Sequence, residues 1–175
     1  MKRSSLELSR RLVVTPFFAS HRPTLTRTVG EAMTRDVFVA APDDPIYDAA
    51  ALMVASRVSG LPVVATDDRV VGIVTLTDIL YRCRTPHGSI ADALRDWLGG
   101  QGGVDWSKVS GVRVADVMSS PAIVAGPDET LQAAAGRMLE RKVDRLPVVE
   151  GGRLVGILTR SDIIAELVAW AEQEE

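Results

Sequence analysis

The sequence predicts an α+β fold, built from two β-α-β-β-α repeats that pack about a pseudo-two-fold axis. The first observation is internal repetition: GIVTLTD at residues 72–78 recurs as GILTRSD at 156–162, and LPVV at 61–64 recurs at 146–149. The second is a shared register, because the copies lie 85 residues apart up to the turn at 66–68 and 84 apart beyond it. A register that holds over about fifty residues and breaks only at a turn indicates two copies of one structural unit.

Residues 1–28 precede the first repeat and form a basic N-terminal arm. One acidic residue, Glu7, accompanies its basic side chains, and apolar residues are interspersed among them. The basic residues are Lys2, Arg3, Arg10, Arg11, Arg22 and Arg27. We expect an arm of this mixed character to dock on its own domain or on a sister subunit, and contact with nucleic acid or anionic lipid is the alternative.

Each repeat opens with a short lead-in, followed by a brief apolar strand predicted at residues 37–40 and 122–125. Proline and acidic residues at 42–45 and 127–130 then begin a helix. A preset φ, side-chain capping and the helix macrodipole favour these residue types in a first turn. Apolar residues continue at helical spacing in both copies. They are Ile46, Ala49, Ala50, Met53 and Val54 in the first copy and Leu131, Ala134, Ala135, Met138 and Leu139 in the second.

Two valine-rich runs joined by a tight turn come next in each copy, and they predict a β-hairpin. The runs cover residues 61–65 and 70–74 in the first copy, and 146–149 and 154–158 in the second. A second helix follows, from about residue 77 to 84 and from about residue 161 to 174.

These elements assign residues 29–84 to the first repeat and residues 111–175 to the second. Residues 85–110 form a linker between them, in which the spacing of Ile90, Ala93, Leu94 and Trp97 predicts a short helix over residues 89–98.

Composition excludes several classes of protein. The 175 residues are 46% hydrophobic and 25% charged with a net charge of −3, which is typical of a soluble globular protein and argues against bulk nucleic-acid binding. No apolar run reaches the roughly 18 residues that a membrane span needs, and charges interrupt the N-terminal segment, so we expect a cytoplasmic protein. Cys83, His21 and His87 show no metal-ligand spacing and no nucleophile–base arrangement, so we expect no enzyme activity.

A β-α-β-β-α unit that occurs twice, with an LPVV strand followed by Gly-Ile-apolar-Thr-x-x-Asp, resembles the CBS domain, named for cystathionine β-synthase. The tandem pair resembles a Bateman module, over roughly residues 29–84 and 111–170. The resemblance implies two packed sheets whose clefts bind AMP, ADP, ATP, S-adenosylmethionine or NAD(H), with no required cofactor. It also implies a homodimer formed through the paired domains.

Thr75 and Asp78, repeated as Thr159 and Asp162, lie where a strand ends and a helix begins. One interpretation is a capping box, in which the threonine and the acid satisfy backbone N–H groups reciprocally. The other is a ligand site, because a helix N-terminus suits a phosphate and a carboxylate can accept both hydroxyls of a ribose. The spacing alone supports both interpretations.

The resemblance implies that Thr75 and Asp78 hold phosphate and ribose in one cleft, and that Thr159 and Asp162 do so in the other. Backbone around Val39 and Val124 would flank the adenine, although both valines depart from a hydroxyl residue that is common in the family. The strand entries would flank it too. They are Gly60, Leu61 and Pro62 in the first copy and Arg145, Leu146 and Pro147 in the second.

The two clefts are expected to differ, because Arg145 stands where the first copy has Gly60, and Arg160 where it has Leu76. These arginines would neutralise phosphate charge and favour charged nucleotides in the second-copy cleft. The alternative is that they lie on a solvated surface or pair with Asp144.

The leading hypothesis is a non-catalytic regulatory module that senses energy state through adenosine-containing ligands and acts on an unknown effector protein. The rival is a structural or interaction scaffold that has no physiological small ligand.

Overall fold

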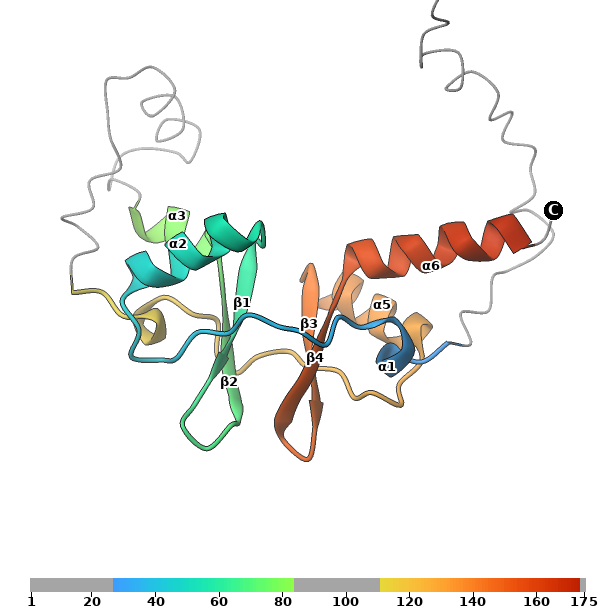
Figure 1. The fold of residues 1–175 in the computed structure, drawn as a ribbon, viewed down its shortest axis with the longest axis horizontal. Helices are drawn as coiled ribbons and strands as arrows, with labels where there is room; N and C mark the ends of the chain where they lie inside the picture. Colours follow the sequence, from blue (N-terminus) through green and yellow to red (C-terminus); the bar gives the residue numbers. More distant parts are fainter. Residues whose placement is uncertain (1–26, 84–110, 174–175) are drawn as a thin grey trace, which may run out of the picture.

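The computed structural model describes residues 27–83 and 111–173, which form two units of like architecture side by side (Figure 1). The predicted linker helix, most of the basic arm and the two final residues lie outside the described residues. The first unit contains α2 (Ile46–Ser56), β1 (Gly60–Val64), β2 (Val70–Thr75) and α3 (Leu76–Cys83). The second contains α5 (Leu131–Arg141), β3 (Arg145–Glu150), β4 (Arg153–Thr159) and α6 (Arg160–Gln173). The lead-ins form the short helix α1 (Val29–Ala32) and the 3₁₀ turn η4 (Val114–Asp116).

Each unit is built on one antiparallel hairpin, β1–β2 or β3–β4, as the valine-rich runs predict. The pairing register is the same in both, with Pro62 opposite Ile73 and Pro147 opposite Ile157. Both hairpins carry a register shift at the equivalent place, after Val63 and after Val148. The predicted α+β class is therefore confirmed.

The predicted first strands are wrong as regular strands, because each segment makes a single parallel bridge. Ala40 pairs with Val63, and Ala125 pairs with Val148. The chain leaves the sheet at once, because Asp44 closes a turn by accepting a 2.7 Å hydrogen bond from the N–H of Ala41. In the second copy, the carboxylate of Glu129 closes the same turn on the N–H of residue 126 at 2.8 Å.

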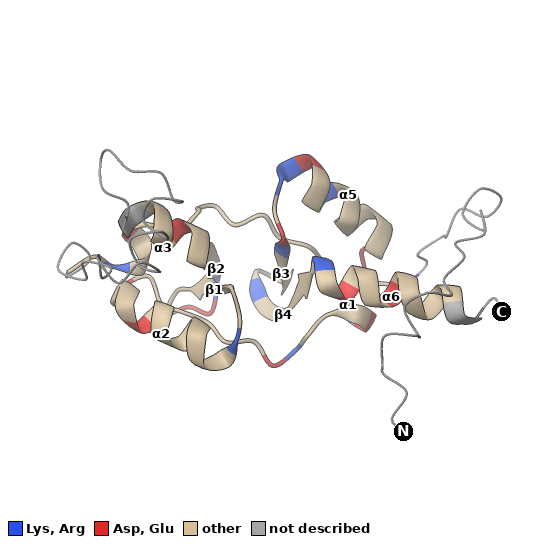
Figure 2. Ribbon diagram, turned by 90° about the horizontal axis from the view of Figure 1, so that it is seen from above, with Lys and Arg blue, Asp and Glu red and all other residues tan. Residues whose placement is uncertain are grey.

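The lead-ins are exchanged between the units. Val29 opens the first repeat but is fully buried in the second core, and Val114 opens the second repeat but is fully buried in the first core. Figure 2 shows α1 beside α6, in the second unit. The two hydrophobic cores therefore do not follow the repeat boundaries along the chain.

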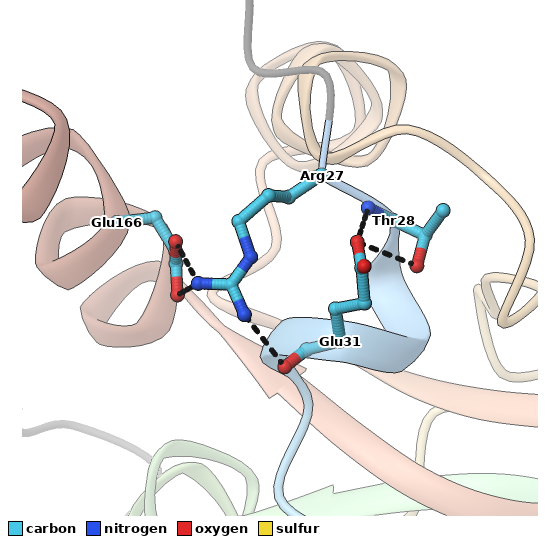
Figure 3. Close-up of polar contacts among 4 residues, drawn as sticks. All are labelled: Arg27, Thr28, Glu31 and Glu166. Atoms are coloured by element: carbon cyan, nitrogen blue, oxygen red, sulfur yellow. Dashed lines mark hydrogen bonds and ion pairs between the residues drawn. The ribbon is translucent and has the colours of Figure 1, made fainter.

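Polar contacts fasten α1 to α6 (Figure 3). Nη1 of Arg27 lies 2.6 Å from both carboxylate oxygens of Glu166, and Nη2 of Arg27 donates to the carbonyl of Glu31 at 3.4 Å. The carboxylate of Glu31 in turn accepts from the backbone N–H of Thr28 at 2.8 Å and lies 3.2 Å from its hydroxyl. These two hydrogen bonds from Thr28 hold the pKa of Glu31 below its ordinary value.

Directly after each lead-in, and before it crosses to its own unit, the chain pairs with the last strand of the unit that holds the lead-in. Thr34 exchanges backbone hydrogen bonds of 3.0 and 2.9 Å with Ile157, and Ser119 exchanges bonds of 3.0 and 2.8 Å with Ile73. Thr34 and Ser119 occupy equivalent positions of the two copies, as do Ile73 and Ile157. These reciprocal contacts relate the units by the predicted pseudo-two-fold axis.

Candidate functional site

Two clefts of similar size lie between the units. One has a volume of about 420 Å³ and includes Thr75 and Asp78, and we call it the Thr75 cleft. The other has a volume of about 440 Å³ and includes Thr159 and Asp162, and we call it the Thr159 cleft. Both volumes fall within the range of about 300–1,000 Å³ that is usual for small-molecule sites.

A capping box holds the threonine and aspartate in each cleft. In the Thr75 cleft, Oδ2 of Asp78 accepts from the backbone N–H of Thr75 at 2.8 Å and from its hydroxyl at 2.7 Å. The N–H of Asp78 donates to the hydroxyl oxygen of Thr75 at 3.2 Å. The same three bonds join Thr159 and Asp162 at 2.7, 2.7 and 3.4 Å. The capping interpretation is thus realised at both helix starts.

The capping boxes do not close the clefts. The bonds of each box to its aspartate carboxylate all use Oδ2, so the cap itself leaves Oδ1 uncommitted. Both aspartates are only partly buried and line open space. The cap and a ligand contact can therefore coexist on one carboxylate.

The opposite wall of each cleft comes from the other repeat. Phe38 and Val58 of the first repeat face the Thr159 cleft, and Ile123 and Val143 of the second repeat face the Thr75 cleft. The phenylalanine side chain is half exposed, with 50% of its surface accessible. Each cleft therefore combines a polar helix start from one repeat with an apolar wall from the other.

One cation occupies an equivalent position in each cleft: Arg57 in the Thr159 cleft and Lys142 in the Thr75 cleft. Both are the C-caps of the preceding helices and have the left-handed conformation, with a φ of 55°. The left-handed cap turns the chain out of the helix and into the strand that borders the cleft. The sequence interpretation missed these two residues, although a basic residue one turn before each LPVV strand is a signal that both copies share.

The remaining predicted site residues are distributed more widely. Gly60 lines the Thr159 cleft and Arg145 lines both clefts, whereas Leu61 and Pro62 of β1 and Leu146 and Pro147 of β3 are buried and line neither. Val39 is 42% exposed and also lies outside both linings. It is the preceding residue, Phe38, that faces the cleft.

Val124 lines a third hollow, of about 870 Å³, between residues 121–124 and the outer face of α5. Arg137 organises this region by donating to the carbonyl of Val124 at 2.7 Å and pairing with the carboxylate of Glu129 at 2.8 Å. The hollow is larger than the clefts, but it is wide open and lined by one repeat alone. It therefore lacks the two-sided construction that a ligand between the repeats would use.

The two arginines of the second copy have different surroundings. Arg160 forms a 2.8 Å ion pair with Asp144 and lines neither cleft. Arg145 lines both clefts, and its Nη2 donates to the hydroxyl of Ser59 at 2.6 Å. Burial lowers the pKa of the Arg145 guanidinium, and the nearby carboxylate of Asp144 opposes that change. The guanidinium nevertheless stays charged at neutral pH, as arginine does in proteins.

Within residues 27–83 and 111–173, no group of three or more histidine, cysteine, aspartate or glutamate residues could hold a metal ion. No helix in these two ranges has both the length and the apolar character needed to cross a bilayer.

Comparison with known proteins identifies relatives of the repeat. The family model described as the CBS domain matches residues 29–84 and 114–169. The chain is 34% identical over 147 residues to the chloroplastic CBS domain-containing protein CBSX1 of Arabidopsis thaliana, a match that covers 78% of the chain and 62% of that protein. It is 30% identical over 145 residues to an inosine-5'-monophosphate dehydrogenase of Methanocaldococcus jannaschii, covering 82% of the chain and 24% of the dehydrogenase.

A solved structure shares the fold. The crystal structure of CBSX2 in complex with AMP matches with a TM-score of 0.64 and 30% sequence identity. The match covers 83% of the chain and 98% of that structure. The chain therefore has the architecture of a complete domain pair, while it spans less than two thirds of the length of CBSX1.

Proposed function

Because the chain belongs to the CBS-domain family, we propose that it is a regulatory module that binds adenosine-containing ligands in the clefts between its two repeats. The observation that carries this proposal is the pair of equivalent clefts, each with a Thr–Asp helix start on one side and an apolar wall on the other. The AMP complex of CBSX2 supports AMP as the first ligand to test.

The chemistry of each cleft suits the parts of an adenine nucleotide. The free oxygen of Asp78 or Asp162 can accept from ribose hydroxyls, and the helix start beside it favours a phosphate. The apolar wall, with Phe38 in one cleft and Ile123 in the other, offers a surface for the base. ADP, ATP, S-adenosylmethionine and NAD(H) share the adenosine moiety, and no cofactor is required in this proposal.

Regulation follows from the two-sided construction of the clefts. A ligand that touches both repeats changes their relative orientation only through its different affinity for the two arrangements. The proposal includes an energy-sensing role in the cytoplasm and an effector on another polypeptide. It assigns no catalytic step to the chain and no contact with nucleic acid.

The proposal also includes a homodimer, formed through the helices. Val54 of α2 and Leu139 of α5 occupy equivalent positions, and each has 72% of its surface exposed. Leu80 of α3 and Ile164 of α6 form a second equivalent pair, 38% and 57% exposed. These side chains supply an apolar surface of the same kind on both units, which suits two-fold pairing with a second copy. Light scattering of the Val54→Asp, Leu139→Asp double variant tests this, and a mass equal to that of the unsubstituted chain would count against the interface.

A thermal-shift panel of nucleotides tests ligand binding. A ligand at 100 times its Kd should stabilise the protein by about 2.7 kcal/mol. Asp78→Ala and Asp162→Ala should each weaken this effect, whereas Asp128→Ala, an exposed carboxylate outside the clefts, should not. A flat panel would favour the rival function, a scaffold without a small ligand.

A further inference from the structure

The two clefts meet at Ser59 and Arg145. Of the described residues, Ser59 and Arg145 alone line both clefts. The 2.6 Å hydrogen bond from Nη2 of Arg145 to the Ser59 hydroxyl holds the guanidinium at this boundary. A ligand in either cleft can therefore reach the same cation.

The pseudo-two-fold axis does not duplicate this arginine. The position equivalent to Arg145 is Gly60, and a Cβ placed on Gly60 would lie 2.8 Å from Nη1 and 3.1 Å from Cζ of Arg145. The guanidinium thus occupies the space that a side chain at residue 60 would need. Because residue 60 has no Cβ, the side chain of Arg145 can lie at the boundary and line both clefts.

The guanidinium has unused hydrogen-bonding capacity. Its Nε is buried and has no hydrogen-bond acceptor among the described residues. Its one hydrogen-bond partner there is the neutral hydroxyl of Ser59, and the neighbouring carboxylate of Asp144 is paired with Arg160 at 2.8 Å. A phosphate offers what this side chain lacks, since a guanidinium donates two parallel, charge-assisted hydrogen bonds to such a group.

We infer that Arg145 couples the two clefts, so that a phosphate-bearing ligand in one weakens the binding of a phosphate-bearing ligand in the other. This inference rests on the proposed function. One guanidinium fork donates its paired bonds to one phosphate at a time, so the second ligand meets a cleft without its arginine. Because the effect depends on the phosphate, adenosine binds the two clefts independently.

Calorimetric titration of the full chain with AMP tests the inference. Asp78→Ala and Asp162→Ala each disable one cleft, and their isotherms give the affinity of the other cleft alone. The second AMP bound by the unsubstituted chain should bind at least about fivefold more weakly than AMP binds to either variant, since coupling typically amounts to 5- to 150-fold. Adenosine should show no such difference.

Variants of the arginine complete the test. Arg145→Met keeps the apolar stem but not the charged guanidinium, and its AMP isotherm should show two independent sites. Arg145→Lys keeps the charge without the fork, and it should retain only part of the coupling. If Arg145→Met does not fold, the comparison of AMP with adenosine on the unsubstituted chain decides the question.

Two outcomes separate the inference from the function on which it rests. An AMP isotherm of the unsubstituted chain equal to the sum of the two single-cleft isotherms would overturn the coupling and leave the proposed function intact. No heat of AMP binding to any form of the chain, confirmed by an unchanged melting temperature, would overturn both.

Discussion

Met33 packs directly against Gly156, so the segment that enters the first repeat is seated on the last strand of the second. The backbone carbonyl oxygen of Thr34 also lies 2.9 Å from the place that a Cβ on Gly156 would occupy. The equivalent contact joins Met118 to Gly72, where Sδ would lie 2.7 Å from an added Cβ. Both glycines are therefore needed for close approach between the repeats.

Gly156→Ala should destabilise the protein by about 1–3 kcal/mol, because the added methyl group meets a backbone atom that cannot move freely. Gly136→Ala is the matched control, since this glycine lies within helix α5 and nothing stands within 4 Å of an added Cβ. The control should stabilise the protein by about 0.5–1 kcal/mol through helix propensity. Urea unfolding monitored by circular dichroism measures both, and equal effects of the two changes would contradict the packing argument.

Because the lead-ins are exchanged, we expect that shortening a lead-in valine destabilises the other repeat rather than the repeat that contains this valine in sequence. Val29→Ala should lower amide-exchange protection in β3 and β4, and Val114→Ala should lower it in β1 and β2. Each loses buried methyl groups at a cost of about 1–3 kcal/mol. Hydrogen exchange read by mass spectrometry separates the strands. Loss of protection confined to the hairpin of the same repeat would exclude the exchange.

The capping box predicts a loss of stability that does not depend on ligand. Thr159→Ala removes the hydroxyl that Asp162 and its backbone N–H engage, and should cost about 0.5–2 kcal/mol in ligand-free protein. Thr159→Ser keeps the hydroxyl and should recover most of that loss. Thermal unfolding without nucleotide measures both variants. Equal melting temperatures for the alanine variant and the unsubstituted protein would show that the hydroxyl does not cap α6.

Glu129 predicts an acid-sensitive contribution to stability. Burial opposes ionisation of this carboxyl group, but hydrogen bonds from Arg137 and from the N–H of Gly126 outweigh burial and hold its pKa below the ordinary value. The unfolded chain therefore binds the proton first, at about pH 4.3. The contribution is fully present above about pH 5 and is lost as pH falls through the lower, folded-state pKa.

The Glu129→Gln variant should therefore be less stable than the unsubstituted protein at pH 7, with the difference shrinking as pH falls below about 5. Glu140→Gln, an exposed change on helix α5, which follows Glu129, controls for the loss of one carboxyl group. Urea unfolding at a series of pH values provides the measurement. A stability difference that does not change with pH would rule out ionisation of Glu129 as its source.

The repeat is the part of the fold that local sequence predicts well. The hairpin strands and the second helices lie within about one residue of their expected bounds, because apolar periodicity and turn residues act locally. The first helices begin only at Ile46 and Leu131, because the segments 42–45 and 127–130 that were expected to open them form turns instead. Exchange of the lead-ins was not predicted, because Val29 and Val114 look alike in sequence. Which core each of them fills depends on contacts more than 80 residues apart, such as the hydrogen bond from the N–H of Val29 to the carbonyl of Glu129.

The site was predicted only in part, because local sequence signals reveal some of its residues and long-range contacts determine the others. The Thr–Asp pairs lie at the clefts because a helix start has a sequence signature. The opposite walls come from the other repeat, so the choice of Phe38 over the adjacent Val39 depends on which side of an irregular segment turns inward. The position of Arg145 between two clefts depends on the backbone of Gly60, which spacing along the chain does not reveal.

Because each core is completed by a valine from the far copy, neither half of the chain is self-sufficient. A polypeptide that ends at residue 83 would contain Val29, which packs in the core of the second unit. A polypeptide that begins at residue 111 would contain Val114, which packs in the core of the first unit. When the two fragments are mixed, they should associate and complete each other's cores. Either fragment alone would expose a hydrophobic core that lacks one of its buried side chains.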